Sequence, residues 1–227
     1  MGKVRLIEIK ERILADNRKL AEQLRSRLAA SRTFLLNLMS SPGSGKTSLL
    51  LKTVEALGDR YRIAVVEADL DSTVDADRIA AAGVPAVQLQ TGGFCHVEAA
   101  MVEQALECLD PAELDLIVIE NVGNLICPAQ SDTGAHANVA MTSVPEGDDK
   151  PLKYPIIFAG GDLVVLNKID YLSLEPFDVE AFARRVEQLN PKAPLCRLSC
   201  RTAEGLACWL DWVEDRLRSA FPAGTAV

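Results

Sequence analysis

The segment from Ser40 to Thr47 combines residue types and spacing that can bind the phosphates of a nucleotide. It reads SSPGSGKT, the phosphate-loop pattern G-x-x-x-x-G-K-[ST] with Ser40 at the first glycine position, a change that would strain the backbone if that position required a positive φ. Glycines allow backbone N–H groups to point toward phosphate oxygens, and the start of the following helix adds partial positive charge. In this pattern Lys46 contacts the β- and γ-phosphates and Thr47 coordinates Mg²⁺. The predicted phosphate-binding residues are Gly43, Ser44, Gly45, Lys46, Thr47 and Ser48.

A second motif, Asn167-Lys168-Ile169-Asp170, follows a predicted strand downstream and indicates guanine recognition. The Asp170 carboxylate can accept hydrogen bonds from guanine N1–H and N2–H₂, a pair of donors that adenine lacks. Two charge-assisted bonds of about 1.5–3 kcal/mol each would favour guanine by roughly 10²-fold or more. A solvated loop carboxylate is the alternative. Residues 199–201 read Ser-Cys-Arg where the third base-contacting loop of GTPases usually reads Ser-Ala-Lys, so we expect these residues only as neighbours of the base.

Carboxylates at two other strand ends are candidates for magnesium coordination. Many GTPases carry D-x-x-G after the strand beside the phosphate loop, whereas this chain has Glu120-Asn121-Val122-Gly123. We predict that Glu120 and Asp69 hold Mg²⁺ with Thr47, and that Asp71 and Asp75 belong to a mobile switch; solvated loop acids are the alternative. Because no glutamine or arginine finger is evident, we expect slow intrinsic GTP hydrolysis that dimerisation or a partner accelerates. The expected catalytic residues are Lys46, Thr47, Asp69 and Glu120.

Cysteine and histidine side chains at two further strand ends are candidate ligands for a soft metal. Cys95 and His96 open a predicted helix, and Cys127 follows the strand that ends at Glu120. The helix dipole favours a thiolate, and thiolate with imidazole suits Zn²⁺ or Ni²⁺ better than a hard ion. Three ligands are one short of a closed tetrahedral site, and the adjacent Cys95 and His96 cannot easily turn to one ion, whereas a two-fold dimer would supply the set twice. On spacing alone, buried thiols and a capping histidine remain the favoured interpretation.

The other cysteines and the second histidine belong to no motif. Cys108, Cys196, Cys200 and Cys208 lie in apolar helix or strand surroundings and are predicted to be core thiols, and His136 is predicted to be a loop histidine. In a cytosolic chain of this size, six cysteines are better explained as thiols or metal ligands than as disulfides.

The composition is that of an ordinary globular protein. Its 227 residues suffice for one large α/β domain, with 48% hydrophobic and 25% charged residues. A formal net charge of −8 argues against non-specific nucleic-acid binding. No apolar run approaches the roughly 20 residues that span a bilayer, and the charged start does not fit a signal peptide. We therefore expect a cytoplasmic protein that binds neither nucleic acid nor membrane.

An alternation of predicted strands and helices positions these motifs. Residues 1–30 carry an amphipathic helix from about residue 5 to residue 30, which we expect to pack on the GTPase domain formed by residues 31–227. Residues 143–161 are predicted to be a loop followed by a short helical turn. The predicted strands are 34–39, 63–68, 86–89, 116–120, 139–143, 163–166 and 195–198, and the later helices are 46–57, 74–82, 95–109, 179–189 and 203–219.

Several of these strands, such as IAVVEA, are continuously apolar, as expected for a sheet covered on both faces. Strands that alternate with helices favour a mainly parallel sheet, and ligands bind at the carboxyl ends of such strands. The expected fold class is therefore an α/β P-loop NTPase with a mostly parallel central sheet, helices on both faces and an N-terminal helical extension.

The combined motifs resemble those of the HypB family, the GTPases that incorporate nickel into hydrogenases. The resemblance covers nearly the whole chain and rests on SSPGSGKT, VDADRI, TGGFCHVEAAMVEQAL, ENVGNLICPAQSDTG, EGDD and LNKIDYL. It implies a GTP-dependent homodimer that works with a partner metallochaperone and passes nickel to [NiFe]-hydrogenase large-subunit precursors. By position, it implies that Cys95, His96 and Cys127 bind Ni²⁺ or Zn²⁺ at the dimer interface. GTP or GDP and Mg²⁺ are the other implied ligands.

Three other functions compete with this one. A urease-type nickel GTPase shares the fold, but its Cys-Pro-His motif is absent because Cys127-Pro128 is followed by Ala129. A small P-loop kinase or ATPase with a structural zinc site is disfavoured by Asp170. A non-catalytic metal-binding or scaffold protein with a vestigial nucleotide site is disfavoured by the intact Lys46 and Thr47.

Overall fold

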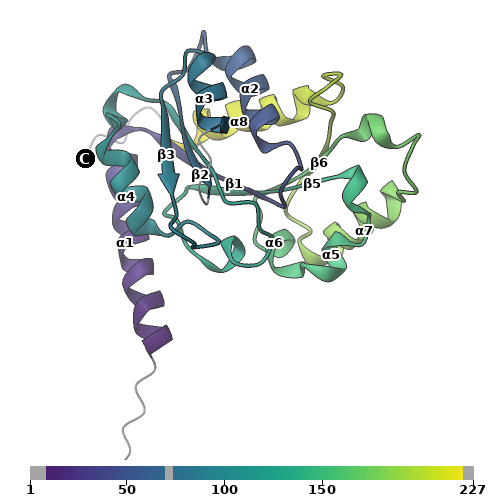
Figure 1. The fold of residues 1–227 in the computed structure, drawn as a ribbon, viewed down its shortest axis with the longest axis horizontal. Coiled ribbons are helices and arrows are strands. Elements are labelled where there is room, and N and C mark those ends of the chain that lie inside the picture. The colour runs from purple at the N-terminus through teal and green to yellow at the C-terminus, as the bar shows by residue number, and fades with distance from the viewer. Residues whose placement is uncertain (1–8, 70–73, 222–227) are drawn as a thin grey trace, which may run out of the picture.

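The computed structural model of the protein describes residues 9–69 and 74–221. Its centre is a seven-stranded sheet in which all neighbouring strands run parallel, in the order β3-β2-β4-β1-β5-β6-β7 (Figure 1). Each strand coincides closely with a predicted one, which confirms the predicted fold class. The strands are β1 (Phe34–Ser40), β2 (Ile63–Asp69), β3 (Ala86–Gln90), β4 (Leu116–Glu120), β5 (Ala137–Ser143), β6 (Leu163–Asn167) and β7 (Leu195–Arg197).

Helices cover both faces of this sheet (Figure 1). Helices α2, α3 and α8 lie over one face, and α1, α4 and the α5–α7 group lie over the other. The α-helices are α1 (Ile9–Ser31), α2 (Lys46–Leu57), α3 (Val74–Ala81), α4 (Ala99–Glu107), α5 (Lys150–Lys153), α6 (Pro155–Ala159), α7 (Val179–Leu189) and α8 (Leu206–Ala220). Single 3₁₀ turns are η1 (Pro111–Glu113), η2 (Pro128–Gln130), η3 (Val144–Glu146) and η4 (Ile169–Tyr171).

The alternation of side chains along each strand divides the core into layers. On β2, Val65 packs in the cluster that contains Leu49 of α2, whereas Val66 packs in the cluster that contains Val102 of α4. Both faces of each central strand are therefore buried, which explains the continuously apolar sequences. Because the strands are parallel, their carboxyl ends meet at one edge of the sheet, and the polar motifs follow those ends.

Two segments differ from the prediction. Helix α4 begins at Ala99 and not at Cys95, because the N–H of Val97 is bound by the Asn121 side chain at 3.2 Å and Glu98 has extended backbone geometry at the N-cap. Residues 144–159 form η3, α5 and α6 where a loop with one helical turn was predicted. Each of these three elements begins with a proline at its first or second position, where the missing N–H has no intrahelical partner to lose.

The C-terminal half of α1 packs against α4. Ala21, Leu24 and Leu28 are buried there. The Asn17 side chain donates to the carbonyl of Asp132 at 2.8 Å and accepts from the N–H of Ala99 at 3.0 Å. Residues 1–8 of the predicted N-terminal segment lie outside the described residues. Within the described ranges, none of the helices combines the length and apolar character that a membrane span requires.

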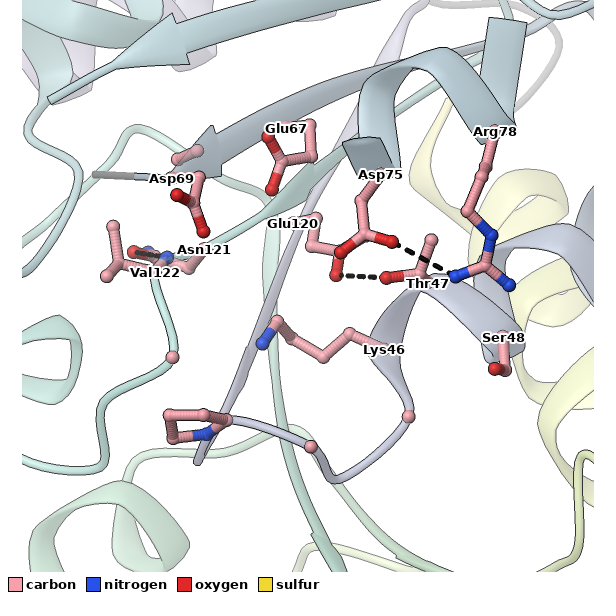
Figure 2. A pocket seen from close by; sticks show the side chains of 15 residues that line it. Lys46, Thr47, Ser48, Glu67, Asp69, Asp75, Arg78, Glu120, Asn121 and Val122 are labelled. Carbon is pink, nitrogen blue, oxygen red and sulfur yellow. Dashed lines mark hydrogen bonds and ion pairs between the residues drawn. The ribbon is translucent and has the colours of Figure 1, made fainter. Parts of the chain in front are cut away.

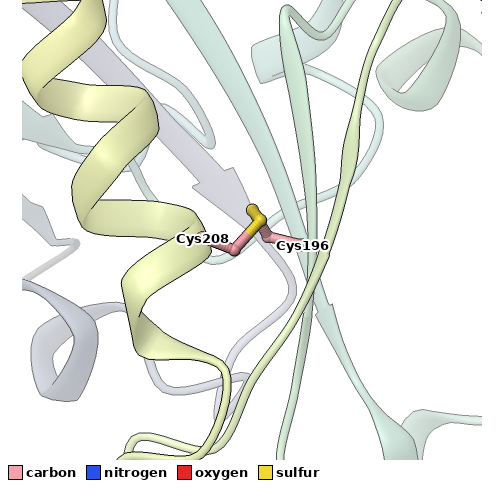
Figure 3. Close-up of a disulfide and its surroundings, with 2 residues drawn as sticks. All are labelled: Cys196 and Cys208. Carbon is pink, nitrogen blue, oxygen red and sulfur yellow. A yellow bond between two sulfur atoms is a disulfide. The ribbon is translucent and has the colours of Figure 1, made fainter.

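Cys196 on β7 and Cys208 on α8 form a disulfide, which corrects the prediction that both are core thiols (Figure 3). Their Cα atoms are 5.7 Å apart, because α8 returns along β7 directly after the turn of residues 198–205. Cys196 is buried and Cys208 is exposed. The prediction argued from the cytosolic redox state, which carries no information about the distance between two cysteines.

The remaining predictions for this group have mixed outcomes. Cys108 is exposed at the C-cap of α4, so its prediction as a core thiol is wrong. Cys200 is half-buried at the edge of the core, and burial raises the pKa of its thiol to about 11. His136 lies in the loop before β5, where its Nδ1 accepts a hydrogen bond from the Leu35 N–H at 3.0 Å and its ring stacks on Phe34.

Candidate functional site

A cavity of about 390 Å³ lies at the carboxyl ends of β1, β2 and β4. Figure 2 shows the side chains of Lys46, Thr47 and Glu120 converging on it, with Glu67 and Asp69 entering from β2. Its lining residues are Pro42, Gly43, Gly45, Lys46, Thr47, Ser48, Glu67, Ala68, Asp69, Asp75, Arg78, Glu120, Asn121, Val122 and Gly123. The predicted phosphate-loop and magnesium residues are thus brought together, except that Ser44 is buried and does not line the cavity. Asp71, predicted to belong to a mobile switch, lies outside the described residues.

The phosphate loop has the backbone that its glycines predict. Gly43 and Gly45 have φ values of 75° and 101°, and a Cβ on Gly45 would come within 2.6 Å of the Asn167 amide. Ser40 is the last residue of β1 and does not have a positive φ, so the replacement of glycine there costs no strain. Its Oγ accepts a hydrogen bond from Lys46 Nζ at 3.2 Å.

Burial of Lys46 prepares its amine for an anion. Burial lowers the pKa of the Lys46 amine, and the Glu120 carboxylate opposes that shift. A partly desolvated ammonium group gains more from contact with a phosphate than one in bulk water. The arrangement therefore suits a bound polyphosphate.

Glu146 braces the phosphate loop from behind, a role that the sequence did not reveal. Its Oε1 accepts hydrogen bonds from Ser44 Oγ at 2.7 Å and from the Ser143 N–H at 2.8 Å, and its other oxygen accepts from the Ser41 hydroxyl. The one signal in the sequence was its position in EGDD, which carried no assigned role.

Three carboxylates gather beside Thr47. Oxygen atoms of Glu67, Asp75 and Glu120 lie within 4.8 Å of one another, and Thr47 Oγ1 donates to Glu120 Oε1 at 2.9 Å. Glu67 Oε2 and Glu120 Oε2 are buried, and neither has a hydrogen-bond partner among the described residues. Burial raises the pKa of Glu120, and raises that of Glu67 to about 7. Unpartnered buried oxygens of this kind fit Mg²⁺, which prefers oxygen ligands.

Two residues of this cluster were missed or assigned differently by sequence reasoning. The sequence does not single out Glu67, because this residue lies inside a strand that is otherwise almost entirely apolar. Asp75, predicted to belong to a mobile switch, lies in the first turn of α3 and its Oδ1 accepts from Arg78 Nη1 at 3.1 Å. Arg78 lines the cavity although no arginine finger was evident in the sequence (Figure 2).

A second cavity, of about 240 Å³, adjoins the first through Gly45 and Ser48. Its other lining residues are Asn167, Lys168, Asp170, Tyr171, Cys200 and Arg201. Ser199 Oγ donates to Asp170 Oδ1 at 2.6 Å, and the Cys200 N–H donates to Asn167 Oδ1 at 3.2 Å. The loops after β6 and β7 therefore form the wall where the base-reading residues were predicted.

The motif residues also bind the phosphate loop directly. Asn167 Nδ2 donates to the carbonyl of Ser44 at 2.8 Å, and Lys168 Nζ donates to the carbonyl of Gly43 at 2.7 Å. These bonds fix the distance between the phosphate-binding and base-binding parts of the site. The two cavities together suit one extended nucleotide.

The soft ligands meet on the loops that follow β3 and β4. The candidate ligand atoms of Cys95, His96 and Cys127 lie within 4.8 Å of one another, and Cys95 Sγ is 3.9 Å from His96 Nδ1. The expectation that the adjacent Cys95 and His96 cannot turn to one ion is therefore wrong. Gly92 and Gly93 form a turn with φ values of 61° and 100°, and the backbone bends again at Cys95 and His96, where the two side chains lie on the same side.

Neighbouring polar groups orient this triad. His96 Nε2 lies 3.2 Å from Glu98 Oε1, so its Nδ1 remains on the side of the cysteines. Cys95 lies in a loop and not at a helix N-terminus, so the predicted stabilisation of its thiolate by the dipole of α4 is absent. Its pKa is raised because it shares a hydrogen bond with Cys127. A metal ion would replace that shared proton with a positive charge that both sulfurs bind.

The chain is similar to known proteins in both sequence and fold. The nucleotide-binding domain of the CobW/HypB/UreG family matches residues 33–197. A relative from Azotobacter vinelandii, named hydrogenase maturation factor HypB, is 48% identical over 98% of this chain and 75% of its own length. The protein of the same name from Escherichia coli K12 is 44% identical over 95% of this chain and 74% of its own length.

Among solved structures, a crystal structure of HypB from Helicobacter pylori in complex with nickel superposes with a TM-score of 0.86. That protein is 36% identical, and the match covers 93% of this chain and 100% of that chain.

Proposed function

The chain belongs to the HypB family of hydrogenase maturation factors, and on this premise we propose that it is a GTPase whose nucleotide cycle controls the binding and delivery of nickel. Nickel is the cargo, a [NiFe]-hydrogenase large-subunit precursor in the cytoplasm is its destination, and a metallochaperone is the partner. One observation carries the proposal. The ligand atoms of Cys95, His96 and Cys127 lie within 4.8 Å of one another. Cys127 lies on the same loop as residues 121–123, which line the phosphate cavity.

The residues around the first cavity support hydrolysis of GTP by water. The water oxygen attacks the γ-phosphorus as the bond to the β–γ bridging oxygen breaks, and GDP and phosphate leave with the proton of the water on phosphate. Lys46 stabilises the charge that develops on the phosphate oxygens, and backbone N–H groups of the phosphate loop hold them in place. Mg²⁺, when bound, supplies further positive charge at these oxygens. The residues that would hold it are Thr47, Glu120, Glu67, Asp69 and Asp75.

Slow intrinsic turnover is part of the proposal. The described cavity wall contains no glutamine that would orient water, and the guanidinium of Arg78 is engaged by Asp75 at 3.1 Å. Phosphoryl transfer depends mainly on positioning and charge stabilisation, so an incomplete site is slow. Dimerisation or a partner would complete it.

The second cavity supports a preference for guanine. Asp170 lies in its wall with Oδ1 held by Ser199. A fixed carboxylate can accept from N1–H and N2–H₂ of guanine, and adenine would leave it unpaired. This preference distinguishes the proposal from a P-loop kinase or ATPase with a structural zinc site.

A homodimer would complete the metal site. The described part of one chain offers the three ligands of this triad, whereas a closed tetrahedral zinc site and a square-planar nickel site need four. The neighbours Phe94 and Ile126 expose 55% and 53% of their surface beside Cys95 and Cys127. A two-fold related copy would cover these apolar side chains and bring a second set of ligands. Zn²⁺ is the alternative occupant, since the same ligands suit it.

A urease-type nickel GTPase remains the second candidate of the same class. The absence of a Cys-Pro-His motif after Glu120 and the names of the most similar relatives favour the hydrogenase function.

The proposal is tested by following nickel release into a chromogenic chelator from protein loaded with Ni²⁺ and either GTP or a non-hydrolysable analogue. We expect release to be faster with GTP and to follow phosphate production. In Lys46→Ala, phosphate production and the faster nickel release with GTP should both be lost. Lys192→Ala, at an exposed lysine far from the site, should behave as the wild type. Nickel release at one rate with every nucleotide would contradict the proposal.

A further inference from the structure

One short segment, residues 120–127, touches the nucleotide cavity at its start and carries a metal ligand at its end. Glu120 accepts the hydrogen bond of Thr47 at 2.9 Å. Gly123 lies against the phosphate loop so closely that a Cβ there would come within 2.8 Å of the Pro42 ring. The segment ends at Cys127. A movement of the phosphate loop or of Glu120 would therefore displace the segment that carries this ligand.

Asn124 ties the segment to the loop that carries the other two ligands. Its Nδ2 donates to the carbonyl oxygen of Cys95 at 3.2 Å. Its Oδ1 accepts from the N–H of Ile126 at 2.9 Å, directly before Cys127. One amide side chain therefore bridges the backbone beside both cysteines of the triad.

Asn121 makes a second tie on the other side of His96. Its Oδ1 accepts from the N–H groups of Val97 at 3.2 Å and Val122 at 2.9 Å, and its Nδ2 donates to Asn37 Oδ1 on β1 at 3.0 Å. The side chain has 0% exposure, and Figure 2 shows it beside Val122 in the cavity wall. Val97 is thereby fixed to the end of β4.

We propose that Asn124 and Asn121 are positioning residues that make the Cys95–His96 loop move together with residues 120–127, so that the nucleotide state sets the geometry of all three metal ligands at once. The two ties join the loop at the carbonyl of Cys95 and the N–H of Val97, on either side of His96. Without them, a shift of residues 120–127 displaces Cys127 alone and separates it from the other two ligands. This inference rests on the proposed function, because it requires a nucleotide in the cavity and nickel at the triad.

The test measures a coupling ratio, the dissociation constant of Ni²⁺ with GDP bound divided by that with a non-hydrolysable GTP analogue bound. Both constants come from competition with a chromogenic chelator. Coupled sites commonly differ by about 5- to 150-fold, in either direction. We expect a ratio in this range for the wild type. In Asn124→Ala the ratio should move toward one by a factor of about 2 to 30. By linkage, the effect of nickel on the relative affinity for the analogue and GDP should fall by the same factor.

Two further variants separate coupling from folding and from local structure. Asn124→Asp keeps an acceptor for the Ile126 N–H but loses the donor to Cys95, and it should lower the ratio as Asn124→Ala does. Gln130→Ala, at an exposed position just beyond Cys127, should leave the ratio unchanged.

A purely structural role for Asn124 would weaken nickel binding equally with both nucleotides and leave the ratio at the wild-type value, which would overturn the inference. A wild-type ratio of one would overturn it too. In that case Cys127→Ala decides the fate of the proposed function. Nickel binding lost in Cys127→Ala leaves the metal site standing, whereas nickel binding retained there means that the proposed function fails as well.

Discussion

Replacing Asp170 with asparagine isolates the proposed guanine-reading contact with almost no change in shape. Ser199 Oγ donates to Asp170 Oδ1 at 2.6 Å. Oδ2 is buried in the wall of the second cavity, where no described residue forms a hydrogen bond with it. That oxygen and the remaining lone pair of Oδ1 are the acceptors left for N1–H and N2–H₂ of guanine. In Asp170→Asn, one oxygen acceptor is replaced by an NH₂ donor, which cannot form a hydrogen bond with the N–H donors of guanine.

The magnitude follows from the two lost bonds. Charge-assisted hydrogen bonds contribute about 1.5–3 kcal/mol each, so their loss costs about 3–6 kcal/mol, or about 10²- to 10⁴-fold in affinity. The Asp170 side chain is 13% exposed, so water replaces the lost partner only in part. Arg201, 3.7 Å away, partly neutralises the carboxylate and weakens its bonds to the base. We therefore expect GDP to bind about 10²- to 10³-fold more weakly to Asp170→Asn.

The assay is competition against a fluorescent guanine nucleotide, with GDP, ADP and xanthosine diphosphate as competitors. Xanthine carries a carbonyl in place of the guanine amino group, so the new NH₂ donor should make the variant prefer xanthosine diphosphate. Asp211→Asn, at an exposed position on α8, is the matched control and should bind GDP as the wild type does. Equal weakening of GDP and ADP, or a loss of GDP affinity below about threefold, would refute the assignment of Asp170 as the base reader.

Three further predictions concern the phosphate loop, the carboxylate cluster and the disulfide. Gly45→Ala should weaken nucleotide binding about tenfold or more and destabilise the protein by about 1–3 kcal/mol, because Gly45 has a φ of 101° and its new Cβ would meet Asn167 at 2.6 Å; unchanged values in nucleotide titration and thermal unfolding would contradict this. In nucleotide-free protein with EDTA, the pKa of Glu67 is raised from its ordinary 4.5 to about 7, so the folded state binds the proton more tightly than the unfolded state. The resulting contribution to the free energy of unfolding is fully present below pH 4.5 and is lost as the pH rises through 7. Between about pH 5.5 and about pH 8, urea unfolding should show the free energy of unfolding falling by about 1–2 kcal/mol more in the wild type than in Glu67→Gln. An equal fall in both proteins would contradict this prediction. Reduction of Cys196–Cys208, which are 12 residues apart, should lower the free energy of unfolding by about 3 kcal/mol, and a reductant that leaves the unfolding midpoint in place would argue against it.

The sequence predicted the fold and the nucleotide site because both depend on local patterns. Strand β4, with the sequence LIVIE, must be buried on both faces, and the residues that follow parallel strands meet at one edge of the sheet. The sequence therefore predicts that Lys46, Thr47 and Glu120 belong to one site. That Thr47 donates to Glu120 at 2.9 Å follows from the pairing of β1 with β4, which brings Leu38 beside Glu120.

The sequence could not reveal contacts that depend on how separate loops pack. Glu67 sits within an apolar strand, and nothing local indicates that its carboxylate joins Asp75 and Glu120. Glu146 supports Ser44 across a separation of 102 residues. The start of α4 was placed too early at Cys95, because helix propensity does not report a tertiary hydrogen bond such as the one from Val97 to Asn121.

The cysteines show the same limit. Cys196 and Cys208 are brought together by the return of α8 onto β7, and Cys108 faces solvent although it lies between Leu106 and Leu109. Predictions from cellular compartment and hydropathy rest on trends averaged over many proteins. The pairing and the exposure of a particular cysteine depend on how this one chain packs.

The most direct test of the central claim is a titration of Ni²⁺ into protein loaded with GDP or with a non-hydrolysable GTP analogue. Nickel–thiolate absorption reports the ligands, and light scattering reports the mass. We predict thiolate-bound nickel and nucleotide-dependent dimerisation in the wild type and in Cys108→Ala, whose exposed thiol lies outside the triad. Both signals should be lost in the double variant Cys95→Ala, Cys127→Ala. If that double variant binds nickel as the wild type does, these cysteines are not the ligands and the account of a nickel-handling GTPase is contradicted.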